Sequence, residues 1–215
     1  MVAIDGQPNA QSEQENAAND RRSQPRLALL LRSGKLVGPR GEFLCIVRDL
    51  SESGARLRLF HPLVDETDLS LEIVNRQRFI VEKVWEDADE AGFRFVDDIN
   101  LRGFLSGTGP FPKRPLRIHL HHLATLKYAG RVTAAVIHDL SREGVRIQTS
   151  EHLAISQNIR IESEHLPIFE ATVRWRRHPF YGLSLHHVMT LEDLAHRVHK
   201  VQLVNRRCNL GLRQR

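Results

Sequence analysis

The chain lacks the features that mark membrane, secreted and metal-bound proteins. No apolar run approaches the roughly 18 residues that a membrane-spanning helix needs, and the polar N-terminus does not resemble a signal peptide. Only two cysteines occur, Cys45 and Cys208, and their spacing fits neither a disulfide framework nor a metal site. These absences lead us to expect a cytoplasmic protein without a metal centre.

Lysine is also scarce, and arginine supplies most of the positive charge. The 31 Lys and Arg residues include only five lysines, and the formal net charge is +5. Arginine is favoured where a planar group must bind a phosphate or a guanine edge through two hydrogen bonds. A GC-rich genome would also enrich arginine. Composition alone therefore leaves open whether the charge reflects an anionic partner.

Recognisable catalytic signatures are missing as well. The sequence contains no Walker-type loop, no dinucleotide-binding fingerprint and no catalytic triad in a known order. Eleven of the twelve histidines follow residue 118, but no cysteine or HExxH pattern accompanies them, so we expect surface histidines and no metal. We therefore interpret the chain as a binding protein and not as an enzyme.

One seven-residue stretch occurs twice in the chain. Residues 48–54 read RDLSESG and residues 138–144 read HDLSREG, which places the two stretches 90 residues apart. The only two tryptophans, Trp85 and Trp175, keep the same separation. A repeat of this length in a chain of 215 residues indicates two copies of one small domain.

Short apolar or alternating runs, separated by Gly, Pro, Asn and Asp, predict β-strands in both copies. In the first copy the predicted strands are 27–31, 43–47, 55–59, 69–73, 79–84 and 92–96. In the second copy they are 117–124, 131–137, 145–149, 159–162, 171–175 and 182–186. Six short strands without a helix among them favour a closed or nearly closed antiparallel barrel. The tryptophans lie inside two of these runs, and we expect them in the barrel cores.

The fold class predicted is all-β with a C-terminal helix, built from two tandem six-stranded antiparallel barrels. The helical pattern covers residues 190–205, with Thr190 as the N-cap. The expected divisions are a disordered tail at 1–20, a first domain at 21–100, a linker at 101–112, a second domain at 113–190, and a helix with a basic tail at 191–215.

The repeated D-x-S-x-x-G pattern has a purely structural interpretation. Asp and Ser side chains bond to nearby backbone amides and set tight turns, and glycine permits a positive φ. A functional interpretation comes from an arginine pair, Arg22 and Arg26, that precedes Asp49, Ser51 and Gly54 in the first copy. Guanidinium groups suit both phosphates and guanines, so the combination points to a nucleotide ligand.

R-x-x-x-R followed by D-x-S-x-x-G inside a six-stranded unit resembles the PilZ domain, a bacterial receptor domain for the second messenger cyclic di-GMP. The resemblance covers nearly the whole chain as two tandem copies. It implies cyclic di-GMP as the ligand, with no other cofactor. It also implies that an arginine directly before the motif favours an intercalated nucleotide dimer. The implied ligand-binding residues are Arg21, Arg22, Arg26, Asp49, Ser51 and Gly54.

The second copy departs from this pattern in its upstream half. The residues that correspond to the motif there are Lys113, Arg117, Asp139, Ser141 and Gly144. Lysine is a point charge and cannot make the two-pronged contact of arginine. The second copy is therefore the weaker candidate for a ligand site, and it better fits a module for a protein partner or for dimerisation.

Our leading hypothesis is a cyclic di-GMP receptor. Binding would order residues 21–26 and shift the two domains, which would regulate an unidentified protein partner in motility, surface polysaccharide synthesis or a similar output. The alternative is a nucleotide-independent interaction scaffold. Nucleic-acid binding is not expected, and a steep salt dependence would reveal it. The sequence leaves the partner and any homo-oligomer open.

Overall fold

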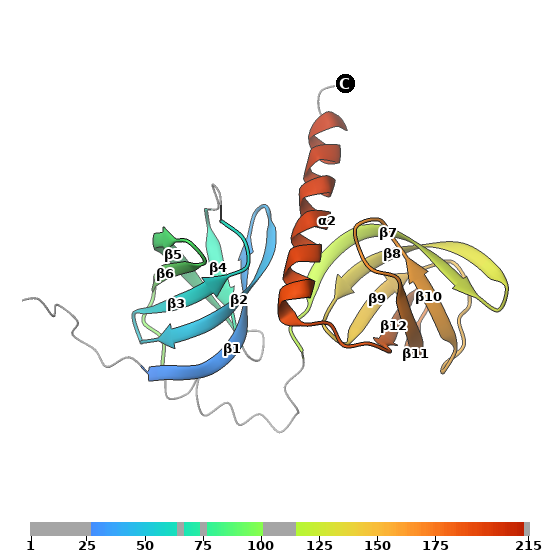
Figure 1. Ribbon diagram of the computed structural model, residues 1–215, viewed down its shortest axis with the longest axis horizontal. Coiled ribbons are helices and arrows are strands. Elements are labelled where there is room, and N and C mark those ends of the chain that lie inside the picture. The colour runs from blue at the N-terminus through green and yellow to red at the C-terminus, as the bar shows by residue number, and fades with distance from the viewer. Residues whose placement is uncertain (1–26, 64–66, 74–76, 101–114, 213–215) are drawn as a thin grey trace, which may run out of the picture.

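The chain forms two six-stranded barrels, and the helix α2 stands between them (Figure 1). This computed structural model describes residues 27–63, 67–73, 77–100 and 115–212. Several predictions therefore lie outside the described residues, namely those on the tail 1–20, Arg21, Arg22, Arg26, the linker 101–112 and Lys113.

The first barrel closes in the strand order β1-β2-β3-β6-β5-β4, with antiparallel pairing throughout. Its strands are β1 (Leu27–Gly38), β2 (Gly41–Leu50), β3 (Gly54–Leu59), β4 (Leu69–Glu72), β5 (Arg78–Asp87) and β6 (Glu90–Phe95). Each of the six overlaps a predicted range. Leu57 and Leu59 of β3 are buried, whereas Arg56 on the opposite face of the strand is exposed, as the alternating pattern predicted.

The second barrel repeats this order as β7-β8-β9-β12-β11-β10. Its strands are β7 (Ile118–Tyr128), β8 (Arg131–Leu140), β9 (Gly144–Gln148), β10 (Asn158–Glu162), β11 (Phe169–Arg177) and β12 (Phe180–Leu185). Branched apolar side chains fill its interior, among them the fully buried Ile118, Ile137, Ile147 and Ile161. The prediction of two tandem barrels is confirmed.

The helix α2 (Leu191–Leu212) belongs to the second core and also reaches the first barrel. It begins at Thr190, whose hydroxyl oxygen accepts a hydrogen bond from the Asp193 amide at 3.0 Å, as expected of an N-cap. Leu194 and Val198 are buried in the second core, and Leu44 of β2 joins the same cluster from the first barrel. Within the described residues, no helix is both long and apolar enough to cross a bilayer.

The first barrel contacts the second domain and its helix α2, and this contact is called the seam below. The seam depends on a glycine in the hairpin that joins β1 and β2. Gly41 has a φ of 147°, which L side chains rarely adopt. A Cβ at this position would lie 2.2 Å from Oε1 of Gln202 on α2. The Gln202 amide nitrogen donates to the neighbouring Glu42 carbonyl at 2.9 Å. Glycine here lets helix and hairpin pack directly against each other.

We predict that Gly41→Ala destabilises the protein more than Gly130→Ala. Gly130 also has a positive φ of 75°, but a Cβ there would meet nothing within 4 Å. Both substitutions carry backbone strain, and only the first adds an overpacked contact, which costs about 1–3 kcal/mol. Urea unfolding of the two variants measures the difference, and equal losses would contradict the role given to the Gly41–Gln202 contact.

Candidate ligand-binding surfaces

The repeated motif forms the same turn in both barrels, between β2 and β3 and between β8 and β9. The Ser51 amide donates to the Gly54 carbonyl at 2.8 Å, and the Ser51 hydroxyl oxygen accepts from the Gly54 amide at 3.1 Å. Ser141 and Gly144 repeat both bonds at 2.8 and 3.1 Å. The serine thus closes the turn by bonding to the backbone three residues on, as the pattern indicated.

The glycine of the motif is required for a reason other than the one predicted. The φ angles of Gly54 and Gly144 lie outside the left-handed region, so the expectation of a positive φ was wrong. A Cβ on Gly54 would lie 2.5 Å from the Phe93 carbonyl oxygen, and one on Gly144 would lie 3.0 Å from that of Leu183. The close approach of the adjacent strand, β6 or β12, is what excludes a side chain.

A row of paired residues crosses the outer face of each barrel and passes through the motif aspartate, which pairs in turn with Ala28 of β1 or His119 of β7. In the first barrel the pairs run from Trp85 to Gly92, Arg56 and Asp49. In the second they run from Trp175 to Gly182, Arg146 and Asp139. The arginines and tryptophans of this row were not among the predicted site residues. Their separation of 90 residues in the sequence was the signal that could have identified them.

The two tryptophans lie on the surface, so the prediction that they belong to the cores was wrong. Trp85 is 43% exposed and Trp175 is 40% exposed. A Cβ on Gly92 would lie 2.0 Å from Nε1 of Trp85, and one on Gly182 would lie 1.9 Å from Nε1 of Trp175. Each indole therefore lies against the glycine of the next strand, and its remaining surface can stack on an aromatic ligand such as a guanine.

The motif aspartates have different surroundings in the two barrels. The side chain of Asp49 is 25% exposed, and its nearest described cation is Nη1 of Arg56 at 3.8 Å. The side chain of Asp139 is only 6% exposed and lies between Nη1 of Arg117 at 2.8 Å and Nε of Arg146 at 2.5 Å. The Arg117 contact is an aligned hydrogen bond, whereas the Arg146 contact is an ion pair without hydrogen-bond alignment. The negative charge of Asp139 is thus already paired with two arginines of its own domain.

The central arginine of the row is also held differently. Arg56 donates to the Glu90 carboxylate at 3.0 Å, and this bond raises the pKa of Arg56. At the position matching Glu90, the second barrel has Phe180, and the Arg146 guanidinium lies over its ring at 5.9 Å. In the first barrel, the arginine beside the motif is therefore engaged by a carboxylate.

The two turns differ in charge at two matching positions. The first turn contains the exposed Glu52, and the exposed Asp97 follows β6; the matching residues of the second barrel are Arg142 and His187, both exposed. An anionic ligand on the first surface would meet these two carboxylates and one cation of the motif itself, Arg48, whose Nε is buried without a hydrogen-bond partner among the described residues.

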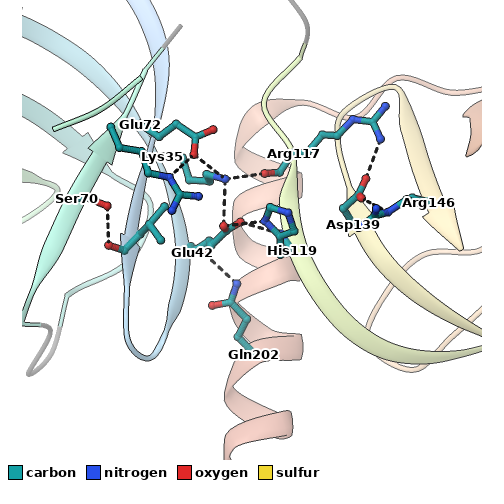
Figure 2. Close-up of polar contacts among 11 residues, drawn as sticks. Lys35, Glu42, Ser70, Glu72, Arg117, His119, Asp139, Arg146 and Gln202 are labelled. Atoms are coloured by element: carbon teal, nitrogen blue, oxygen red, sulfur yellow. Dashed lines mark hydrogen bonds and ion pairs between the residues drawn. The ribbon is translucent and has the colours of Figure 1, made fainter. Parts of the chain in front are cut away.

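The second motif surface is continuous with the seam (Figure 2). The Arg117 carbonyl accepts a hydrogen bond at 3.0 Å from Nζ of Lys35 in the first barrel, while the Arg117 guanidinium holds Asp139. Lys35 also bonds to Oε1 of Glu42 at 3.1 Å and lies 3.4 Å from the Glu72 carboxylate. The first motif lies seven residues along β2 from Glu42, a span of about 23 Å in an extended strand.

Glu42 receives bonds from both domains and stays ionised. The His119 amide donates to its Oε2 at 2.7 Å, and the His119 ring nitrogen Nδ1 lies 2.8 Å from its Oε1. Burial raises the pKa of Glu42, but the His119 amide, Lys35 and the His119 ring together outweigh burial and leave the pKa below its usual value. In the described part of the chain, no group of three or more His, Cys, Asp or Glu residues is arranged to hold a metal ion.

We predict that Asp139→Asn destabilises the protein more than Asp49→Asn. Removing the charge of Asp139 leaves two arginines without their carboxylate at a buried position, which costs about 1–3 kcal/mol. Asp49 is more exposed and farther from Arg56, so its loss costs less than about 1 kcal/mol. Urea denaturation of the two variants gives both values. A larger loss for Asp49→Asn would show that the ion pairs of Asp139 contribute little.

Comparisons with known proteins were made with the sequence and with the fold. A family model described as "PilZ domain" matches residues 20–104 and 113–202. No curated protein matches. Similar solved structures are the PlzA protein of Borreliella burgdorferi with c-di-GMP (11% identity, 87% of this chain and 98% of that chain, TM-score 0.34) and YcgR of Escherichia coli with c-di-GMP (13% identity, 86% and 88%, TM-score 0.31). A third is the K. pneumonia MrkH–c-di-GMP complex, with 10% identity over 86% of this chain and 90% of that chain and a TM-score of 0.31.

The family model carries the assignment. Its two segments cover most of the chain, and each segment contains all six strands of one barrel. Both segments also contain the D-x-S-x-x-G turn and the tryptophan–glycine pair described above. The chain therefore belongs to the PilZ family and carries two copies of the PilZ domain.

Proposed function

We propose that the chain is a cyclic di-GMP receptor and that its first PilZ domain binds the nucleotide. The observation that carries this assignment is the accessible carboxylate of Asp49, which can accept hydrogen bonds from a guanine. Asp139, its counterpart in the second domain, has both oxygens within ion-pair distance of an arginine. A ligand at the second motif would first have to displace those arginines.

The described part of the first site supplies contacts for a guanine base. The exposed face of Trp85 offers a stacking surface, and Asp49 and the Ser51–Gly54 turn lie in the same row or next to it. These groups do not neutralise the two phosphates of cyclic di-GMP, since Glu52 and Asp97 border the turn. In this proposal Arg21, Arg22 and Arg26 provide that charge and become ordered over the nucleotide.

The position of Arg117 in the second domain supports the proposal that the upstream arginines and the D-x-S-x-x-G turn of the first domain act at one site. Arg117 precedes β7 as Arg26 precedes β1, and Arg117 contacts the motif aspartate of its own barrel at 2.8 Å. An arginine at this position can therefore reach the motif aspartate. By analogy, we propose that Arg26 reaches Asp49 when nucleotide is bound, where phosphate and base would meet.

We further propose that binding changes how the two domains dock. The strand β1 joins the arginine segment at one end to Lys35 of the seam. Ordering of residues 21–26 would act on the seam through this strand, and the altered surface would regulate a protein partner. A ligand shifts such an equilibrium only through its different affinity for the two arrangements. An interdomain distance that is the same with and without nucleotide would refute this part of the proposal.

Isothermal titration with cyclic di-GMP tests the receptor assignment. We expect binding by the full-length protein and by Lys113→Ala, which changes the matching position of the second domain. Losing one two-pronged arginine contact should weaken binding by roughly 5- to 150-fold. We therefore expect Arg22→Ala/Arg26→Ala to abolish measurable heat and Asp49→Asn to weaken binding. Two nucleotides per chain would indicate an intercalated dimer at the first site.

Each negative outcome removes a different part of the proposal. No heat with any cyclic dinucleotide would favour the nucleotide-independent scaffold. Binding that survives Arg22→Ala/Arg26→Ala but is lost in Lys113→Ala would keep the receptor function and move the site to the second domain. The family assignment and the fold stand in both cases. Catalysis forms no part of the proposed function.

A further inference from the structure

Two stacked histidine rings join the first barrel to α2 across the seam. His61 lies two residues after the end of β3, and His199 lies on α2. Their ring centroids are 3.7 Å apart and the ring planes differ by only 11°. His61 also contacts the Phe43 ring of β2 edge-on at 5.3 Å. The pair is therefore a packed aromatic contact between the domains, made from side chains that can acquire charge.

Several basic groups surround this stack. His196, three residues before His199 on α2, has its Nε2 3.1 Å from the Phe60 carbonyl oxygen. Further along α2, the Arg206 guanidinium lies over the Phe43 ring at 5.7 Å and donates to the Arg40 carbonyl. Both His196 and Arg206 interact electrostatically with the two stacked rings. A proton added to either ring would therefore meet positive charge.

The surroundings offer little compensation for such a proton. Glu86 of β5 is the carboxylate that faces His61, but it already accepts bonds from Lys83 at 2.7 Å and from the Leu63 amide at 2.9 Å. Nδ1 of His199 is buried without a hydrogen-bond partner among the described residues. Charging His199 would leave a buried N–H without an acceptor, in addition to the repulsion between the rings.

We propose that the His61–His199 stack is a proton-sensitive clasp, which holds the first barrel against α2 when both rings are neutral and releases it when they are protonated. The clasp acts without any nucleotide and does not involve either motif surface. It therefore adds a second input, acidity, to the contact between the two domains.

The pKa values agree with this geometry. Burial, followed by the charges of His61, Arg206 and His196, lowers the pKa of His199 to about 4. Burial also lowers the pKa of His61, although the Pro62 carbonyl and Glu86 act in the opposite direction. The docked arrangement thus binds fewer protons than an undocked one, so docking weakens as the pH falls from 6.5 towards 4.

A different environment surrounds His119, the seam histidine of β7. His119 faces the Glu42 carboxylate at 2.8 Å, beside Lys35. The seam thus contains one histidine beside a carboxylate and a stacked pair beside basic groups. Variants of the His61–His199 stack change only the second kind of contact.

Small-angle X-ray scattering of the full-length protein at about pH 7.5 and about pH 5, at constant ionic strength, tests the clasp. We expect the radius of gyration to increase at the lower pH while circular dichroism shows that the barrels stay folded. The variant His61→Phe/His199→Phe keeps two stacked rings that cannot be protonated, so it should stay compact at both values. His152→Phe is the matched control, because His152 stacks on His178 at 4.6 Å within the second domain, and it should open as the natural chain does.

A natural chain that stays compact at the lower pH would overturn the proposal. Opening of His61→Phe/His199→Phe to the same extent as the natural chain would overturn it too. If that double variant does not fold, His199→Phe alone gives the answer, because His199 carries the larger pKa shift and its loss should remove most of the opening. A pH response unchanged in His199→Phe would contradict the clasp.

Discussion

The ammonium group of Lys35 depends on the docking of the two domains. Its side chain is 1% exposed, and a buried charge without partners is costly. Two of its partners, Glu42 and Glu72, come from the same barrel, but the third is the Arg117 carbonyl of the second domain. His119 then closes the network on Glu42 from the second domain. Separating the domains would remove two of these polar partners at once, so the seam and the charge network stabilise each other.

This arrangement explains how two copies of one motif come to differ. The turn, its serine bonds and the row from tryptophan to aspartate are the same in both barrels. In the second domain, however, the Arg117 carbonyl accepts a hydrogen bond from Lys35 across the seam, while the Arg117 guanidinium forms an ion pair with Asp139. In the first domain Asp49 lies far along β2 from the seam and stays partly exposed. The contact between the domains therefore distinguishes the paired, buried motif aspartate of the second domain from the partly exposed one of the first.

The repeat made most of the fold predictable, because a period of 90 residues and alternating apolar positions specify strands and their number. Three features were beyond such reasoning because each depends on a neighbouring strand or domain. Trp85 lies on the surface because its ring packs over Gly92, Gly54 is required by the close approach of the Phe93 carbonyl, and the buried Lys35 lies beyond the predicted strand 27–31. The serine turn and its aspartate were predictable because their bonds are local. The 90-residue spacing of Arg56 and Arg146 could have identified the cross-strand arginines, whereas the contacts of the seam leave no such signal in the sequence.

Amide hydrogen exchange with and without cyclic di-GMP tests the central claim most directly, because it reads both motif turns in one sample of the full-length protein. The account predicts slower exchange for residues 49–54 when nucleotide is bound and unchanged exchange for residues 139–144. Slower exchange at 139–144, with 49–54 unchanged, would contradict the account, because the ligand would then have displaced Arg117 and Arg146 from Asp139.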